Sequence, residues 1–533
     1  MNNRESQIAA DVDDLRRLGY TQQLIREMGG FSNFAVSFSI ISILTGAVLL
    51  YGYGLKYAGP IINSIGWPVV SLFTLAVAAS MAEIASAYPT AGGLYFWSFR
   101  LGGRGWAWTT AWLNMIGQVT ITAGINIAAA IYFIGALNAL FGLKLPASWW
   151  FQVAVMVAIM LPQIAINIFG IRLTAWLSDI SVWWHIGGVL GITLLLTIAG
   201  RHHNSASFLF SFQGVPQPVP DTMVLGDASI RSPLFALFPT LKHFYAFAPP
   251  IFLFTLGLLQ AQWTYTGYDA SAHIAEETVM ARLNSAWGVF LSVAVSAIAG
   301  WILLMVLTWC IPNGDVAAVV NDPYPVLYIV AHNLAPFFTN LIALVIFGAM
   351  WLCGLASITS MARMWYAFAR DDGMPGSSLL KRVSGSRHTP VWSIVITSVL
   401  AILICCYAAA FAVVTSISTI ALYLAYVIPI YLNARNRRRR HGEWMTKANA
   451  PWSLGGWAAL INTIAMAWAI FIAIVFMLPP NELVLWTMIA LAIGLALYWS
   501  LWMRRTFTGP SASSFASTSC TPDTYAASPM LKS

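Results

Sequence analysis

The chain has 533 residues, of which 59% are hydrophobic and only 9% are charged, and its mean hydropathy is +0.73. Soluble domains carry roughly a quarter charged residues, so this composition excludes a large soluble core and predicts a protein that crosses a membrane many times. The net charge of +8 collects beside apolar segments, which indicates membrane topology and contact with anionic lipid rather than nucleic-acid binding.

Twelve apolar segments have about the ~20-residue length needed to cross a bilayer. In chain order, spans 1 to 12 are predicted at 34–54, 63–86, 107–137, 149–169, 180–200, 248–272, 287–311, 336–364, 391–411, 415–433, 456–478 and 483–503. The polar residues before span 1 lack the pattern of a secretory signal, so span 1 is expected to act as its own insertion signal.

Basic residues follow a regular pattern between the spans. With the N-terminus inside, 22 of the 27 Lys and Arg residues fall on the cytoplasmic side. The exceptions are Lys56, Lys144, Arg201, Arg231 and Lys242. Because this bias orients membrane proteins, both termini are predicted to be cytoplasmic, in a multi-pass protein of the cell membrane.

Two spans contain glycine where a membrane helix should continue. Span 1 has Thr45-Gly46 in mid-membrane, and span 6 has Thr266-Gly267 at a matching depth. Glycine permits unwound backbone, which persists at that depth only where protein or water satisfies its polar groups. Close packing of small residues is the alternative at each position. Because each break opens a set of five spans, the pair favours an all-α transporter built as a 5+5 inverted repeat, with helices 1 and 6 broken.

This interpretation divides the chain into seven parts. They are a cytoplasmic N-terminal segment (1–33), a first repeat with spans 1–5 (34–200), an extracellular loop (201–247), a second repeat with spans 6–10 (248–433), a basic cytoplasmic loop (434–455), spans 11–12 (456–505) and a Ser/Thr/Pro-rich tail (506–533) that is predicted to be disordered. At the breaks, free N–H groups are suited to a substrate carboxylate, and free carbonyl groups to an ammonium group or a coupling cation.

Several motifs resemble those of known permeases. Ala58-Gly59-Pro60, "AEIASAYP" and "TAGGLYFW" are similar to the signature of amino acid permeases in the amino acid–polyamine–organocation superfamily. "RMWYAFARDDGMP" resembles the segment after span 8 in that superfamily, with an additional Asp372. "GYDASAHIAEET" is most similar to the amino acid/choline transporter branch, which includes GABA and choline permeases. The resemblance covers residues 20–505.

The resemblance implies a leucine-transporter-type fold, in which spans 1, 2, 6 and 7 rock against a scaffold and spans 11 and 12 lie outside the repeat. It also implies substrate contacts from both broken helices. These residues are Thr45, Gly46, Ala47, Tyr265, Thr266, Gly267 and Tyr268. The polar side chains of Asn114 and Gln118 in span 3 lie at a suitable depth to join them, and interhelical hydrogen bonding is the alternative for both.

His185 places an ionisable group inside span 5, where such groups are unfavourable and often functional. In proton-coupled relatives, a lysine of span 5 projects toward the region between spans 1 and 8, and His185 aligns with it. Ser357 and Ser360 of span 8 offer hydroxyl oxygens there. Since imidazole titrates near neutral pH, His185 is predicted to carry a coupling proton. A structural histidine bonded to a carbonyl group is the alternative.

Acidic and basic residues near the cytoplasmic side are predicted to form an inner gate, or else static stabilising pairs. Asp269 is assigned to this gate and not to the substrate pocket. The carboxylates are those of Glu83, Asp269, Glu276 and Glu277, and their expected partners are Arg100, Arg104, Arg363 and Arg370.

The function predicted is secondary active transport of amino acids or GABA by alternating access, coupled to protons. The sequence contains no HExxH, GxSxG or GxxxxGK[ST] motif, so neither an enzyme nor an ATP-driven pump is expected. Five scattered cysteines and the adjacent His202 and His203 predict no metal site, and no cofactor is expected. A choline or amine permease, a substrate exchanger, a channel and a permease-like nutrient sensor remain alternatives. The expected partners are the substrate, a proton and lipid, and the oligomeric state is open.

Overall fold

A computed structural model describes residues 3–216, 233–385, 387–407, 411–439, 445 and 450–510. These residues are predominantly helical, and the extended pairing among them is one parallel bridge between Met28 and Thr278. Part of the predicted loop 201–247, part of the basic loop 434–455, Cys520 and the predicted tail from residue 511 lie outside the described residues.

The first half of the chain contains the predicted spans 1 to 5. Its helices are α1 (Asn3–Arg17), α2 (Gly30–Ile41), α3 (Ile43–Leu49), α4 (Tyr51–Ala58), the π turn η1 (Ile62–Gly66), α5 (Trp67–Ala87), α6 (Leu94–Gly102), α7 (Arg104–Phe141), α8 (Trp149–Phe169), α9 (Ile171–Ala199) and α10 (Ala206–Leu209).

The second half contains the predicted spans 6 to 12. Its helices are α12 (Pro233–Leu237), α13 (Pro239–Ala246), α14 (Pro250–Gly257), α15 (Leu259–Thr264), α16 (Ala270–His273), η2 (Ala275–Glu277), α17 (Ala281–Trp309), η3 (Pro312–Gly314), α18 (Val316–Asn321), α19 (Pro325–Asn333), α20 (Pro336–Arg370), α21 (Ser377–Leu380), α22 (Val391–Tyr407), α23 (Phe411–Arg439), η4 (Gly455–Trp457), α24 (Ala458–Val475), α25 (Glu482–Tyr498), η5 (Trp499–Met503) and α26 (Arg504–Thr506).

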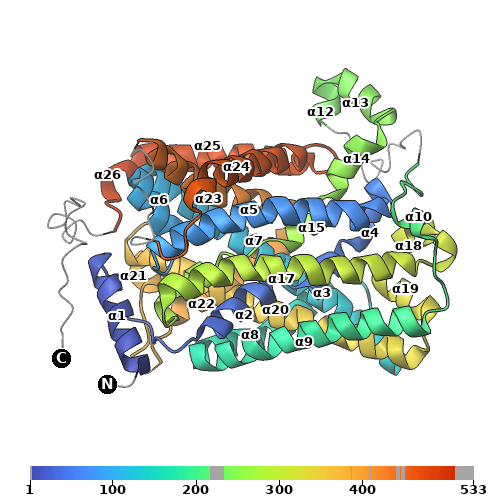
Figure 1. Cartoon of the computed structure of the whole chain (residues 1–533), viewed down its shortest axis with the longest axis horizontal. Helices are drawn as coiled ribbons and strands as arrows, with labels where there is room; N and C mark the ends of the chain where they lie inside the picture. Colours follow the sequence, from blue (N-terminus) through green and yellow to red (C-terminus); the bar gives the residue numbers. More distant parts are fainter. Residues whose placement is uncertain are drawn as a thin grey trace.

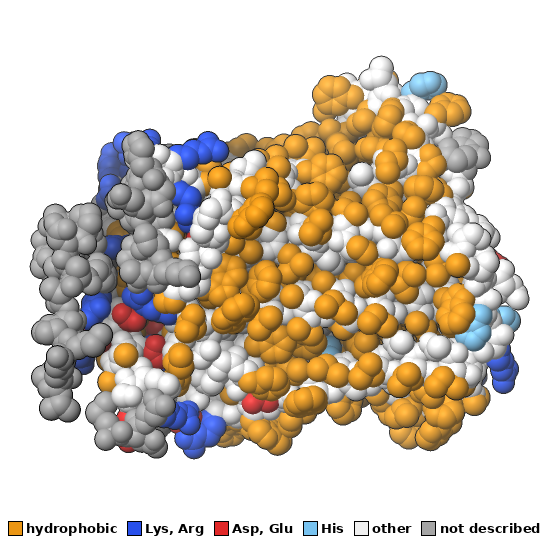
Figure 2. All heavy atoms as spheres, in the orientation of Figure 1, with side chains coloured by type: hydrophobic (Ala, Val, Ile, Leu, Met, Phe, Trp, Pro, Cys, Tyr) orange, Lys and Arg blue, Asp and Glu red, His pale blue; other side chains and the backbone are white. Residues whose placement is uncertain are grey.

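The long helices lie side by side along the molecule, as the arrangement of α5, α9, α17 and α25 shows (Figure 1). One end carries α1, α21 and α26, and we refer to it as the charged end, because most of the visible Lys, Arg, Asp and Glu side chains gather there (Figure 2). Between the two ends the visible surface is dominated by hydrophobic side chains (Figure 2). Such a band is what a bilayer requires of the helices that cross it.

Within the described residues, ten helices are long and apolar enough to cross a membrane, or eleven if the pair Pro239–Ala246 and Pro250–Thr264, bent by 100°, counts as one span. The apolar helix at Val391–Cys406 is shorter than these. The all-helical membrane class is therefore confirmed, while the count of twelve and the 5+5 repeat remain predictions. Helix α7 lies at the centre of the bundle, since 83% of its most apolar stretch is buried, whereas the figure for the last span is 11%.

Span 1 is broken, but not at the glycine that predicted the break. Helix α2 ends at Ile41 and α3 begins at Ile43, and Ser42 between them has a φ of 34°, in the left-handed region. Gly46 lies inside α3, where an added Cβ would overlap with Thr264 of α15. The prediction of a break at Thr45-Gly46 is therefore wrong in position, because Gly46 serves close helix packing instead.

Span 6 is broken at the predicted glycine. Helix α15 ends at Thr264, the chain is unwound through Gly267, and α16 begins at Ala270. Gly267 has a φ of 85°, and Ile40 of α2 occupies the space that a side chain at this position would fill. Glycine is required here both by the backbone conformation and by the close approach of α2.

Candidate functional site

The two breaks lie next to each other inside the bundle, and α2 is bonded to the second of them. The Ser37 hydroxyl donates to the carbonyl oxygen of Tyr268 at 2.9 Å and accepts from the Ser271 N–H at 2.8 Å. The Asn33 amide donates to the carbonyl oxygen of Ser271 at 3.0 Å. Hydrogen bonds from polar side chains thus join the first half of span 1 to the second half of span 6. The two breaks can therefore contribute to one site.

Asp269 is the centre of a fully buried polar cluster. Its Oδ2 accepts from Asn114 Nδ2 at 2.8 Å and from Gln118 Nε2 at 3.2 Å, and it lies 2.9 Å from His273 Nε2. Its Oδ1 accepts from the Tyr426 hydroxyl at 2.9 Å. We refer to these five residues as the Asp269 cluster. It brings together α7, the unwound part of span 6 and α23.

The prediction that Asp269 lies apart from the residues expected to contact the substrate is therefore wrong, while its role in a gate remains a prediction. The sequence analysis placed Asp269 by its depth along span 6, beyond the predicted break, whereas in the structure the backbone is unwound between Tyr265 and Asp269. Unwinding changes the direction in which the side chain leaves the backbone. The carboxylate consequently contacts Asn114 and Gln118, the two span 3 residues that were predicted to face the substrate.

Two tyrosines of α23 satisfy the backbone at the span 6 break, and the sequence analysis missed both. The Tyr423 hydroxyl donates to the carbonyl oxygen of Tyr265 at 2.9 Å. The Gly267 N–H donates to the Tyr426 hydroxyl at 3.2 Å. The available signal was their spacing of three residues within predicted span 10, which places both hydroxyl groups on one helix face.

The residues predicted to contact the substrate are brought together around the breaks and are closed off from solvent. All of them are buried: Thr45, Gly46, Ala47, Asn114, Gln118, Tyr265, Thr266, Gly267 and Tyr268. Thr45 Oγ1 lies 2.6 Å from Ser42 Oγ, and Thr266 Oγ1 donates to the carbonyl oxygen of Trp263 at 2.6 Å. The site is thus occluded from both ends of the bundle.

His185 lies against the span 1 break. Its Nε2 is 2.6 Å from Ser42 Oγ, and its Nδ1 is 2.7 Å from the carbonyl oxygen of Ser181. The two serines predicted to act with it lie elsewhere in the hydrogen-bond network. Ser357 Oγ is 2.6 Å from Thr122 Oγ1 of α7, and the buried Ser360 hydroxyl has no hydrogen-bond partner among the described residues. The His185 ring therefore contacts the span 1 break directly, as the coupling prediction requires. It also bonds a backbone carbonyl oxygen, as the alternative of a structural histidine requires.

Two buried ion pairs link η2 to α20 near the charged end. Arg363 makes a bidentate pair with Glu277 at 3.0 and 3.1 Å, and Arg370 makes one with Glu276 at 3.1 and 3.1 Å. Of these four side chains, Arg370 is the most exposed, at 11%. The pairing predicted for these residues is present. The Ala91 N–H also donates to Glu276 Oε1 at 3.0 Å, which connects the end of span 2 to the same pair.

The partners expected for Glu83 were wrong. Its Oε2 lies 2.7 Å from Arg437 of α23, and its Oε1 accepts from the Leu454 N–H at 2.9 Å. Glu83 thus ties span 2 to the end of span 10, a contact between elements that sequence spacing does not reveal. The Arg100 guanidinium lies 5.9 Å from the centre of the Tyr88 ring, and Arg104 donates to the carbonyl oxygen of Phe507.

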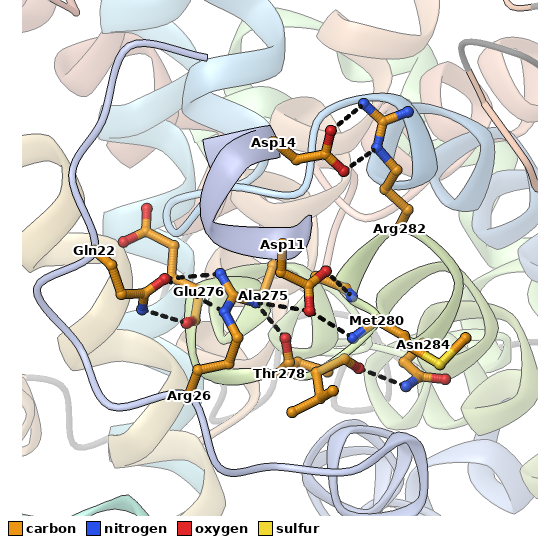
Figure 3. A network of polar contacts seen from close by, with 12 residues as sticks. Asp11, Asp14, Gln22, Arg26, Ala275, Glu276, Thr278, Met280, Arg282 and Asn284 are labelled. Carbon is orange, nitrogen blue, oxygen red and sulfur yellow. Dashed lines mark hydrogen bonds and ion pairs between the residues drawn. The ribbon is translucent and has the colours of Figure 1, made fainter. Parts of the chain in front are cut away.

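The N-terminal segment makes a polar network over the same region, which was not predicted (Figure 3). Arg26 donates to the carbonyl oxygens of Ala275 and Thr278, and its Nη2 lies 2.9 Å from Gln22 Oε1. Burial lowers the pKa of Arg26, while the neighbouring Asp11 carboxylate opposes that shift. The Asp11 carboxylate accepts from the Met280 N–H at 2.7 Å and the Ala281 N–H at 3.0 Å, and so caps the start of α17.

Comparisons with known proteins all point to the same family. Residues 29–501 match the family model described as amino acid permease. The chain is 32% identical to Amino-acid permease BAT1 of Arabidopsis thaliana, over 93% of this chain and 95% of that protein. It is 32% identical to the BAT1 homolog of Oryza sativa subsp. japonica, over 88% and 87% of the two chains. It is 27% identical to Amino-acid permease 2 of Neurospora crassa, over 88% and 81%.

Proposed function

Because this chain belongs to the amino acid permease family, we propose that it is a secondary active transporter that moves amino acids or GABA across the cell membrane by alternating access, coupled to protons. The broken spans hold the substrate, with N–H groups for its carboxylate and carbonyl groups for its ammonium group. The burial of all the predicted contact residues supports an occluded intermediate of such a cycle. Choline or another amine is the alternative substrate, exchange the alternative mode, and nutrient sensing the alternative class.

The observation that carries the proton-coupling proposal is the contact between His185 and Ser42. A carbonyl oxygen only accepts, so Nδ1 carries a hydrogen, and in the neutral ring Nε2 accepts the Ser42 hydroxyl hydrogen. A proton added to Nε2 makes the ring a donor, and the Ser42 hydroxyl must then turn its hydrogen toward Thr45 Oγ1, 2.6 Å away. Protonation of His185 therefore changes the hydrogen bonds at the span 1 break, beside the proposed substrate contacts.

The pairs Arg363–Glu277 and Arg370–Glu276 act in this proposal as the inner gate, which must separate when the site opens to the cytoplasm. The charged end is assigned to the cytoplasm, because the basic residues of the chain favour that side. The test is a charge exchange: Glu277→Arg and Arg363→Glu each lose uptake, and the double variant recovers part of it. No recovery in a double variant that is folded by thermal unfolding would exclude the gate.

The transport function is tested with purified protein in proteoliposomes. Uptake of labelled alanine, GABA and choline is measured with an inward proton gradient, with a sodium gradient, and with unlabelled substrate inside. We expect saturable uptake of alanine or GABA driven by the proton gradient. Uptake that requires only internal substrate would establish exchange, and uptake of choline alone would establish an amine permease. Absence of all three would overturn the substrate assignment.

A further inference from the structure

A cavity of about 380 Å³ lies between the N-terminal segment and the start of α9, at the charged end of the bundle. It is lined by side chains from α1, from the stretch between α1 and α2, and from α9. The charged residues of the lining are Arg4, Arg26, Glu27 and Arg172. Three guanidinium groups thus face one carboxylate, which leaves the cavity positively charged.

Two of the arginines bond the same residue and keep most of their donors for another partner. Arg172 donates to the Glu27 carboxylate from Nε at 2.9 Å and from Nη2 at 2.6 Å. Arg4 Nη2 donates to the Glu27 carbonyl oxygen at 3.0 Å. A guanidinium has five N–H donors, and the contacts within the described residues use one in Arg4 and two in Arg172. Arg26 is buried and bonds carbonyl oxygens near η2, so it adds charge to the cavity rather than free donors.

The cavity adjoins an exposed apolar surface. Its uncharged lining side chains are all apolar, and one turn after Arg172 on α9 comes Trp176, which is 59% exposed. Phe31 of α2 and Trp183 of α9 are 47% and 66% exposed, and their stacked rings are 6.3 Å apart. Helix α9 runs from the charged end along the apolar surface of the bundle (Figure 1 and Figure 2). Exposed tryptophans beside a cationic cavity are typical of the boundary between lipid headgroups and acyl chains.

We propose that this cavity binds the headgroup of an anionic phospholipid of the cytoplasmic leaflet, with its acyl chains against the aromatic side chains of α2 and α9. The free N–H groups of Arg4 and Arg172 bind phosphate oxygens, which the planar guanidinium group suits. The bound lipid contacts α1, residues 26–28 and α9 together, so it holds the N-terminal segment against the bundle. The proposal does not depend on which substrate the protein transports.

The Glu27 carboxylate gives the proposal a prediction of opposite sign. It is the one group in the lining that repels an anion, and it also occupies two donors of Arg172. Glu27→Gln removes the negative charge and keeps the backbone bond from its N–H to Glu277. Loss of either exposed arginine should therefore weaken lipid binding, while loss of the carboxylate should strengthen it. An ion pair with a structural role alone would make Glu27→Gln and Arg172→Gln alike.

The test measures binding of dioleoyl phosphatidylglycerol to the purified full-length protein, by titration in detergent and native mass spectrometry. Dioleoyl phosphatidylcholine is the zwitterionic reference. We expect Arg4→Gln and Arg172→Gln each to weaken phosphatidylglycerol binding about fivefold, the usual contribution of one basic residue at an anionic surface. Glu27→Gln should strengthen it, and phosphatidylcholine binding should stay unchanged in all three variants.

The matched controls are Arg17→Gln and Asp13→Asn. These two residues form an ion pair of 3.1 Å on α1, both side chains are exposed, and neither lines the cavity. The controls remove the same charges from the same segment of the chain, and exposed pairs of this kind contribute little to stability. We expect both controls to bind phosphatidylglycerol as the wild type does.

Four results would overturn the proposal. The first is equal binding of the two lipids by the wild-type protein. The second is a loss in Arg17→Gln as large as that in Arg172→Gln, because the attraction would then come from the general charge of the segment. The third is weaker binding in Glu27→Gln, which would make the ion pair structural. The fourth is displacement of phosphatidylglycerol by an equal concentration of free glycerol phosphate, which would assign the cavity to a soluble phosphate compound instead of a lipid.

Discussion

At the scale of single residues, Ser42 connects a titratable ring to a change in backbone direction. Its left-handed φ of 34° ends α2, and its hydroxyl lies 2.6 Å from both His185 Nε2 and Thr45 Oγ1. Nothing in the sequence marks this position, since serine is uncommon with positive φ and Gly46 nearby is the more obvious candidate for a break. The span that breaks could therefore be predicted, whereas the residue could not.

Replacement of His185 by glutamine tests the coupling role. Glutamine does not titrate, so we expect proton-driven uptake to fall by roughly 5- to 150-fold, the usual range of a coupling free energy. Exchange of internal for external substrate should persist. His332→Gln is the control, because His332 is exposed and bonds a carbonyl oxygen of its own helix. Full proton-driven uptake in His185→Gln would leave His185 with a structural role only.

Gly267 provides a prediction for the second break. Alanine at a φ of 85° costs about 1–2 kcal/mol, and Ile40 also occupies the space of its methyl group. We expect Gly267→Ala to lower the free energy of unfolding by more than about 1 kcal/mol and to abolish uptake. Gly494→Ala in α25 has open space around it and should change neither. Thermal unfolding and alanine uptake of both variants are the measurements.

At the scale of elements, the length of the apolar segments predicted where most helices lie. The predicted ends of the helices were less accurate where polar residues flank the apolar segment. Span 5 was predicted to begin at residue 180, yet α9 begins at Ile171. Arg172 and Asp179 lie in the stretch left between predicted spans 4 and 5, but in the structure both side chains have partners in the N-terminal part of the chain, Glu27 and Ser32. A sequence gives no information about such partners, which explains the late start in the prediction.

The sequence identified which polar residues belong to the candidate site, but it did not predict which of them contact one another. Asn114, Gln118, His185 and Asp269 were each recognised as polar groups in apolar spans. The grouping of Asn114 and Gln118 with Asp269 was missed, because helical spacing does not hold through an unwound segment. The missed Tyr423 and Tyr426 belong to a helix distant in sequence from span 6, and their hydroxyl groups matter only because the break frees backbone groups beside them. Tertiary packing determined both contacts.

Helix α1 provides a prediction about α17. Asp11 supplies from another helix the cap that α17 lacks locally, since Met280 before it is not a capping residue. We expect Asp11→Ala to lower the free energy of unfolding by about 1 kcal/mol and to speed amide hydrogen exchange over residues 281–284. Asp13→Ala should do neither, because its ion pair with Arg17 is exposed. Similar exchange in both variants would contradict the capping role.

At the scale of the whole molecule, charge is segregated along the bundle. Basic side chains at the charged end come from both termini and from the loops around α21, whereas the surface between the two ends is mainly apolar (Figure 2). This segregation followed directly from the sequence, because it depends only on which residues lie between spans. It is also the basis for placing both termini in the cytoplasm.

Orientation is tested by labelling single cysteines in intact cells with a membrane-impermeant thiol reagent. The background replaces Cys406 and Cys520, since the other cysteines, Cys310, Cys353 and Cys405, are buried. We expect Lys144→Cys to be labelled from outside and Arg382→Cys only after permeabilisation, because both positions are exposed on opposite ends of the bundle. The reverse pattern would invert the proposed topology and place the ion pairs of η2 and α20 at the outer side.

The contact between the N-terminal segment and the end of span 6 has an evolutionary consequence. The N–H groups of Glu27 and Met28 donate to the carbonyl oxygen of Glu277, and the Val279 N–H donates to the carbonyl oxygen of Met28. Bonds between backbone atoms do not depend on which side chains the residues carry, proline excepted. The docking bonds can therefore persist through substitutions at positions 27, 28 and 279, which are constrained instead by the burial of Met28 and Val279 and by the ion pair between Glu27 and Arg172.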